Sequence, residues 1–148
     1  VELVEHYLKI QQYRFEERIQ YHVHVQEGLE KLCILPLILQ PIVENSIIHG
    51  LESKEGIGTI DINIYSKSDK TVICISDDGM GMNKEKLNEL HRKLNCYNEK
   101  GRHIGVSNVH QRVKLKYGDS FGVTIDSVEG SYTKVEILLP RAAALKTL

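Results

Sequence analysis

The chain has 148 residues, of which 41% are hydrophobic, and this is enough for a single domain with a real core. Nineteen basic and twenty acidic residues give a formal net charge of −1, so no general attraction to nucleic acid or to an anionic membrane is expected. No stretch reaches the roughly 18 apolar residues of a membrane helix, and no signal peptide is visible. Any anion must therefore bind at a local site.

Cysteine usage and the first residue bear on the origin of the chain. Cys33, Cys74 and Cys96 are an odd number and form no C-x-x-C pair, so we predict reduced thiols in the cytoplasm rather than disulfides or metal ligands. Because the chain starts at Val1 instead of a methionine, we expect it to be a processed or excised piece of a longer protein.

The first half of the chain predicts a helix, a strand and a second helix. Apolar side chains recur at helical intervals over residues 2–18, and residues 20–26 alternate as a half-buried strand does. Residues 35–49 form a strongly apolar helical segment. Within it, Pro41 must either occupy the first turn or kink the helix, since an interior proline costs about 3 kcal/mol. Gly50 is expected to end this helix.

The second half predicts two hairpins separated by two helices. Strands are expected at residues 58–66, 71–77, 121–128 and 132–140. Helices are expected at residues 84–95 and 106–117, the second ended by Gly118. This order predicts an α+β fold, a two-layer sandwich in which a mixed, mostly antiparallel sheet carries helices on one face.

The first candidate site lies in the stretch PIVENSIIHG. Asn45 and His49 are four residues apart, so on a helix they share one face among apolar neighbours. An amide oxygen held there suits Mg²⁺, which prefers oxygen ligands, and Glu44 adds a carboxylate beside it. Taken alone, the stretch is explained more simply as a solvated helix edge.

The second candidate site is DDGMGM, which begins where a predicted strand ends. The carboxylate of Asp77 can accept a hydrogen bond from an exocyclic amino group, and Gly79 and Gly81 permit close approach of a flat ligand. The calcium-binding EF-hand pattern fails, because methionines occupy the third and fifth positions of the loop. Taken alone, the motif is equally compatible with a plain turn.

The third candidate site is GRHIGVSNVHQR, residues 101–112. Gly105 precedes a predicted helix, whose first backbone N–H groups form a ready phosphate site, and Arg102 lies in the adjoining loop. Taken alone, the motif is better explained by helix capping through Ser107 or Asn108. Neither a P-loop nor a dinucleotide fingerprint occurs, so a nucleotide would have to be bound in another way.

In this order, the three motifs resemble the N, G1 and G2 boxes of the GHKL ATP-binding superfamily. Its members include sensor histidine kinases, gyrase-type topoisomerases, Hsp90 chaperones and MutL repair ATPases. More narrowly, LPLILQPIVENSIIHG, ISDDGMGM and HIGVSNVHQRVKLKYG look like the LytS/YesM type of bacterial sensor histidine kinase. The resemblance covers nearly the whole chain and implies ATP and Mg²⁺ as ligands.

The resemblance assigns roles to residues near the adenine ring and near the Mg²⁺ ion. Asn45 matches the Mg²⁺-binding asparagine of the N box, and His49 matches a polar position near the phosphates. Asp77 matches the aspartate that holds the adenine amino group. Gly79 and Gly81 match the glycines beside the base.

The remaining residues are assigned to the phosphates and to the adenine pocket. Gly105 and Asn108 fall in the G2 box, and Thr133 matches a threonine that supports the adenine pocket. Glu44 corresponds to the general base of the hydrolysing relatives. As a departure, His103 stands where many relatives have the first glycine of Gly-x-Gly. We therefore expect the His103 imidazole to be able to contact phosphate, and Arg102 is expected at the same end.

The resemblance also implies how the chain is divided. Residues 1–19 are expected to be a helix from the end of the dimerisation and phosphotransfer region, and residues 20–141 the ATP-binding catalytic domain. Residues 142–148 would be a tail, for which a cloning origin is one interpretation. Residues 83–104 would form a mobile lid over the nucleotide.

The implied activity is transfer of the γ-phosphoryl group of ATP to a histidine outside this chain, because no histidine here lies in a phosphoacceptor motif. The implied partners are the phosphoacceptor segment of the same protein, a response regulator and, in the full-length protein, a second copy. Nucleic acid is not expected. The expected location is cytoplasmic, with membrane attachment only through missing segments.

Two alternatives stay open at this point. One is an ATP hydrolase or protein serine kinase of the same superfamily, in which Glu44 activates water or a hydroxyl group. The other is a non-catalytic interaction module that keeps the fold but binds no nucleotide.

Overall fold

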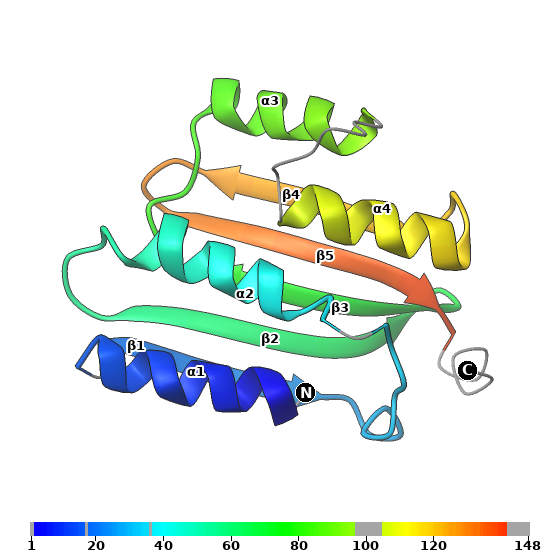
Figure 1. Cartoon of the computed structure of the whole chain (residues 1–148), viewed down its shortest axis with the longest axis horizontal. Coiled ribbons are helices and arrows are strands. Elements are labelled where there is room, and N and C mark those ends of the chain that lie inside the picture. Colours follow the sequence, from blue (N-terminus) through cyan, green and yellow to red (C-terminus); the bar gives the residue numbers. More distant parts are fainter. Residues whose placement is uncertain (1, 17, 36, 97–104, 142–148) are drawn as a thin grey trace.

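The computed structural model describes residues 2–16, 18–35, 37–96 and 105–141, which form two layers (Figure 1). One layer is a five-stranded sheet with the strand order β1-β2-β3-β5-β4. Its strands are β1 (Ile19–Val25), β2 (Gly58–Lys67), β3 (Lys70–Asp77), β4 (Gly122–Val128) and β5 (Tyr132–Pro140). β1 pairs with β2 in parallel, and the other three pairings are antiparallel.

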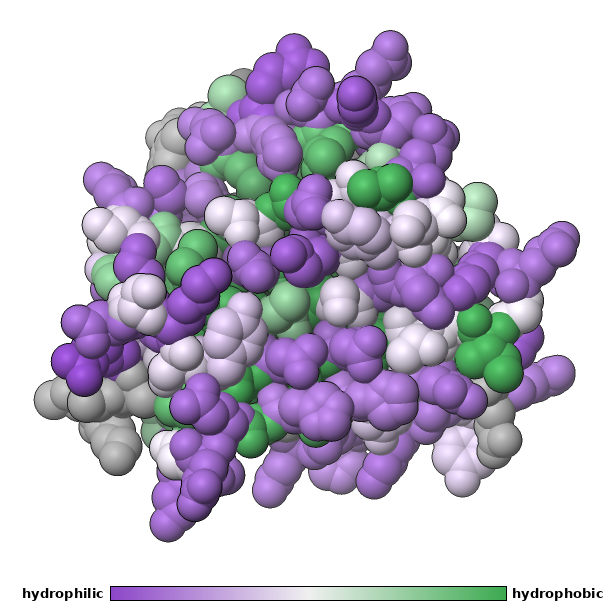
Figure 2. Space-filling view, turned by 180° about the vertical axis from the view of Figure 1, so that it is seen from behind, coloured by the Kyte–Doolittle hydropathy of each residue, from purple (hydrophilic) through white to green (hydrophobic). Residues whose placement is uncertain are grey.

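The second layer consists of helices. They are α1 (Glu2–Arg14), α2 (Gln40–Asn45), the π-helical η1 (Ser46–Leu51), α3 (Lys84–Asn95) and α4 (Val106–Tyr117). α1, α2 and α4 cross the same face of the sheet, and α3 lies beside its β4 edge (Figure 1). The opposite face carries mostly hydrophilic side chains (Figure 2). The predicted α+β sandwich with a mixed, mostly antiparallel sheet is therefore confirmed.

The strands follow the apolar periodicity of the sequence. Along β2 the buried positions alternate, and Ile60, Ile62 and Ile64 point into the core between the layers. β3 has neighbours on both sides and is buried almost continuously. The alternation therefore fixes which face of each strand receives the helices.

The predicted helix at residues 35–49 is corrected at both ends. Helical structure begins only at Gln40, with Pro41 in the first turn, because proline lacks the N–H that an interior position requires. Gly50 does not end the helix, since the chain continues through a wider π turn, closed by a 2.8 Å hydrogen bond from Glu52 N–H to the Ile47 carbonyl. π turns of this kind are frequent at functional sites.

α1 packs into the same core as the rest of the chain. Leu8 is fully buried and Val4 is 5% exposed, and both belong to the cluster that includes β2 and α2 side chains. The opposite side of α1 carries the exposed Ile10 and Tyr13. The helix ends at Arg14, four residues before the predicted end. Its assignment to the end of a dimerisation region stays a prediction.

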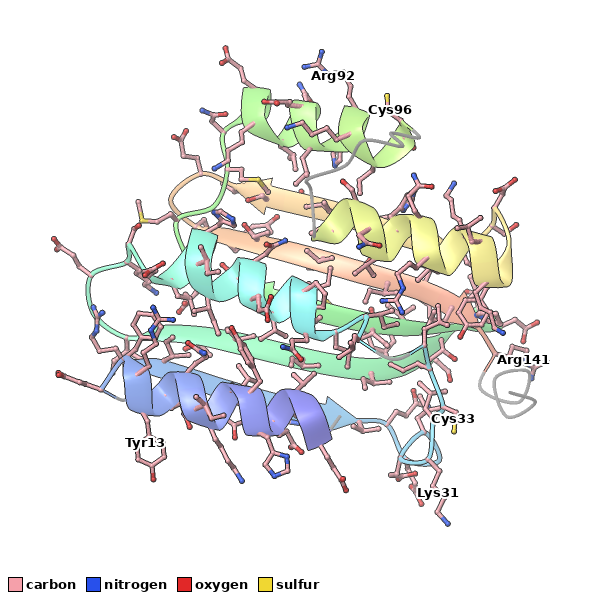
Figure 3. The ribbon with its side chains drawn as sticks, viewed as in Figure 1. Tyr13, Lys31, Cys33, Arg92, Cys96 and Arg141 are labelled. Atoms are coloured by element: carbon pink, nitrogen blue, oxygen red, sulfur yellow. The ribbon has the colours of Figure 1, made fainter. Side chains whose placement is uncertain are left out.

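The cysteines are all free thiols. Cys33 and Cys96 are exposed and lie near the bottom and the top of the view in Figure 3, while Cys74 is buried in β3. Within the described ranges, no helix is both long and apolar enough to cross a membrane.

Candidate functional site

A cavity of about 420 Å³ lies between the helices and one end of the sheet. This volume is within the usual range for small-molecule sites. It is lined by Ile42, Asn45, Ser46, His49, Gly50, Asp77, Gly81, Met82, Lys86, Leu90, Lys93, Gly105, Val106, Ser107, Ile125, Thr133 and Val135. The three sequence motifs, which lie far apart in the chain, therefore meet around one space.

Asp77 is the last residue of β3 and is 3% exposed. Burial raises the pKa of its carboxyl group, and hydrogen bonds from the Ser46 side chain and the Gly79 backbone N–H act in the opposite direction. The Gly79 N–H lies 3.0 Å from Asp77 Oδ1. The carboxylate is thus held in a fixed orientation at the wall of the cavity.

Glycines permit the tight packing around Asp77. A Cβ atom on Gly50 would lie 2.6 Å from Asp77 Oδ1, and one on Gly79 would lie 2.4 Å from the Gly50 carbonyl carbon and oxygen. Gly79 is buried and is not among the lining residues, whereas Gly81 lines the cavity. Gly81 has φ +62°, and its Cβ would lie 2.0 Å from the Val128 carbonyl oxygen. Only glycine fits these contacts.

Thr133 lines the cavity next to Asp77, its register partner on the neighbouring strand. Its hydroxyl group lies 2.9 Å from that of Ser127. Ser127 also accepts the Met82 N–H at 2.8 Å and donates to the Tyr132 carbonyl at 2.7 Å. One buried hydroxyl group thus connects the wall of the cavity, the β4–β5 turn and the end of the second motif.

Asn45, His49 and Gly105 also line the cavity. Asn45 ends α2, and His49 follows in η1. Gly105 precedes α4, and a Cβ there would lie 3.1 Å from Asn45 Nδ2 and 3.7 Å from its Oδ1. The missing side chain therefore leaves the Asn45 amide open beside the first turn of a 12-residue helix. Asn108, in that turn, is exposed and does not line the cavity.

Glu44 does not line the cavity. Its carboxylate accepts a 3.0 Å hydrogen bond from Gln40 Nε2. Burial, and then the nearby Glu44 charge, raise the pKa of Tyr7 in α1. Glu44 is therefore directed toward α1, whereas its neighbour Asn45 faces the cavity. Arg102 and His103 lie outside the described residues.

Several lining residues were missed by the sequence reasoning. Lys86, Leu90 and Lys93 face the cavity from α3, and Ser46 and Ser107 contribute hydroxyl groups. Of these residues, only Lys86, Leu90 and Lys93 could have been found from the sequence. Their spacings of four and seven residues place them on one face of a helix. Lys93 also pairs with Glu89 at 2.8 Å.

A metal ion at this site would depend on few protein ligands. Among the described residues, no group of three His, Cys, Asp or Glu side chains forms a metal site. The Asn45 amide, open toward the cavity, suits Mg²⁺, which commonly uses one or two protein oxygens and completes its shell with waters and phosphates. The residues present therefore fit such an ion.

Comparison with known proteins gives the same family throughout. A family model described as "Histidine kinase-, DNA gyrase B-, and HSP90-like ATPase" matches residues 34–143. Sensor histidine kinase YesM of Bacillus subtilis is 33% identical over 142 residues, which cover 94% of this chain and 22% of that protein. Sensor protein LytS of Oceanobacillus iheyensis is 34% identical over 141 residues, covering 95% and 24%. The chain thus spans less than about a quarter of the length of these relatives.

Solved structures agree on the fold. Histidine kinase AdeS of Acinetobacter baumannii has a TM-score of 0.60 at 16% identity, covering 94% of this chain and 63% of that one. The mycobacterial sensor histidine kinase MprB has a TM-score of 0.57 at 17% identity, covering 94% and 93%. The chain belongs to the family of histidine kinase-, DNA gyrase B- and HSP90-like ATPases, as an ATP-binding catalytic domain of the sensor histidine kinase type.

Proposed function

We propose that the chain binds Mg²⁺–ATP in the 420 Å³ cavity and donates the γ-phosphoryl group to a histidine outside residues 1–148. The observation that carries this proposal is that Asp77 and Asn45 line the same cavity from different elements. A carboxylate suits the amino group of an adenine, and an amide beside a helix N-terminus suits the phosphates and their metal ion.

In this proposal the adenine lies against Asp77, Gly81 and Thr133, and the triphosphate extends toward Gly105. Backbone N–H groups at the start of α4 favour negative charge there. Lys86 and Lys93 bring two cations from α3 to the same cavity. Asn45 would hold the Mg²⁺, which neutralises phosphate charge when bound. Phosphoryl transfer needs mainly such positioning and charge stabilisation.

Support for the proposed partners comes from the relatives, which are named as sensor histidine kinases or sensor proteins. We propose that the phosphoacceptor histidine lies elsewhere in the same longer protein, that a response regulator receives the phosphoryl group, and that the longer protein is a dimer. The domain would act in the cytoplasm. Alone, the chain should bind nucleotide with little or no autophosphorylation.

Nucleotide titration followed by a transfer assay tests the proposal. We expect a non-hydrolysable ATP analogue to bind the chain, and Mg²⁺ to strengthen that binding. Mixing the chain with ATP and an isolated phosphoacceptor segment should then label the segment's histidine. Absence of nucleotide binding would instead support a non-catalytic interaction module.

The variant Glu44→Ala distinguishes the proposed histidine kinase activity from the hydrolase or serine kinase alternative. If Glu44 were the base, this variant would abolish turnover without weakening nucleotide binding. Because Glu44 is directed toward Gln40 and α1, we expect histidine phosphorylation by Glu44→Ala to stay within a few-fold of the unmodified chain.

A further inference from the structure

Three side chains form a row across neighbouring strands at one end of the sheet. Asp77 of β3 is the register partner of Thr133 of β5, and Thr133 is the register partner of Ser127 of β4. Residues directly opposite one another on paired antiparallel strands project to the same face. Asp77 and Thr133 line the cavity, while Ser127 is 8% exposed and does not.

The proton of the Ser127 hydroxyl group can be placed from its three contacts. The Met82 N–H donates to it at 2.8 Å, so this contact uses a lone pair. The Tyr132 carbonyl oxygen lies 2.7 Å away and has no proton to give, so Ser127 must donate its only proton there. In the remaining 2.9 Å contact, Thr133 must therefore be the donor.

This direction leaves the Thr133 hydroxyl group with only lone pairs for a ligand. The neighbouring Asp77 carboxylate can also only accept when ionised. An adenine presents a donor at the 6-position, its exocyclic amino group, whereas a 6-oxopurine presents an acceptor oxygen there and has its donor, N1–H, on the next ring atom. A site whose polar groups would be left unpaired rejects the second ligand strongly.

We propose that Ser127 is a positioning residue that fixes Thr133 as a hydrogen-bond acceptor and thereby makes the cavity select 6-aminopurine over 6-oxopurine nucleotides. The inference rests on the proposed function, because it requires that the cavity binds a purine nucleotide. Ser127 itself does not line the cavity and acts only through Thr133.

The test compares the Kd values of the chain for non-hydrolysable analogues of ATP and of inosine triphosphate. Ser127→Ala frees the Thr133 hydroxyl group to rotate and donate to a 6-oxo group. We expect the preference for the adenine analogue to fall about five- to tenfold, mainly through tighter binding of the inosine analogue. Ser127→Thr, which keeps the hydroxyl group, should restore the preference.

A double-mutant cycle separates this role from support of the loop at Met82. Thr133→Val removes the Thr133 hydroxyl group but leaves the Ser127 bonds to Met82 and Tyr132 intact. In that background, Ser127→Ala should leave the ratio of the two Kd values unchanged, because the group through which it acts is gone. A merely structural role of Ser127 would shift the ratio equally in both backgrounds and would overturn the proposal.

Three further results are decisive. An unchanged ratio in folded Ser127→Ala overturns the role of Ser127 while leaving ATP binding established. If Ser127→Ala fails to fold, Thr133→Val alone must still lose preference for the adenine analogue, and an unaltered preference overturns the inference. Failure of the unmodified chain to bind either nucleotide refutes the proposed function instead.

Discussion

Asp77 combines burial with a charge that the proposed function requires. Its side chain is 3% exposed, and loss of water raises its pKa above the ordinary value of 3.8 despite the hydrogen bonds from Ser46 and Gly79. Without nucleotide, ionisation of Asp77 therefore costs folding free energy. A bound amino group would offset that cost, so stability and binding make opposite demands on this residue.

Asp77→Asn should separate the two demands. We expect its affinity for adenine nucleotides to fall roughly ten- to hundredfold, the usual effect of losing a hydrogen bond to a charged group. Isothermal titration calorimetry measures this affinity. An unchanged affinity would contradict the proposal that Asp77 binds the adenine ring.

The same variant should be more stable than the unmodified chain when nucleotide is absent. Because the folded pKa of Asp77 is raised, its stabilising contribution is complete below pH 3.8 and is lost as the pH rises through the folded pKa. The Asp77→Asn variant does not lose stability in this way, because its amide does not ionise. The difference in free energy of unfolding should therefore be largest at neutral pH and disappear toward pH 3.8. Urea unfolding at several pH values checks the sign, and a difference that grew toward acid would contradict it.

Gly81 gives a second prediction at the scale of single residues. Gly81→Ala combines an unfavourable positive φ with a Cβ 2.0 Å from the Val128 carbonyl oxygen. Gly28→Ala is the matched control, since Gly28 has φ +88° but no atom within 4 Å of the Cβ position. We expect the control to cost about 1 kcal/mol and Gly81→Ala at least about 2 kcal/mol more, measured by urea unfolding. Equal costs would show that the loop relaxes freely.

At the scale of elements, the α2–η1 segment illustrates what periodicity cannot decide. Its apolar spacing extends back to residue 35, yet the helix begins at Gln40 because Pro41 fits only the first turn. Gly50 resembles a helix stop in the sequence, whereas its actual role is to let the second motif approach η1 closely. His49 in η1 and Asn45 in α2 both line the cavity, as their four-residue spacing predicts.

The packing of α1 leads to a prediction about the boundary of the domain. Leu8 is fully buried against the core, and Ile10, two residues later, is 64% exposed. We expect Leu8→Ala to cost about 2–5 kcal/mol of unfolding free energy, and the control Ile10→Ala less than about 0.5 kcal/mol. If both variants were equally mild in thermal unfolding, α1 would be dispensable and a domain starting at residue 20 would fold alone.

At the scale of the whole molecule, the cavity joins α2–η1, α3, α4 and one end of the sheet. A ligand that fills it should therefore stabilise the entire fold. At roughly a hundredfold excess over Kd, nucleotide binding adds about 2.7 kcal/mol to the free energy of unfolding.

Thermal unfolding with an ATP analogue tests this coupling together with the role of Asn45. We expect the analogue and Mg²⁺ to raise Tm, and a chelator to remove part of that increase. In Asn45→Ala the chelator should have little effect, because the protein ligand of the ion is missing. Equal sensitivity to the chelator in both proteins would contradict the assignment of Mg²⁺ to Asn45.

The sequence by itself determined the strands, the two-layer fold and the motifs that meet at the cavity, because alternation, helical spacing and glycine–acid clusters are local properties of the chain. Tertiary structure alone decided that Glu44 and Asn45 face different ways, that Asn108 stays outside the cavity and that α3 contributes Lys86 and Lys93. It also decided that the Ser127 hydroxyl group contacts that of Thr133, since this contact depends on the register between β4 and β5. Side-chain direction and register arise from packing between distant segments, which no local pattern encodes.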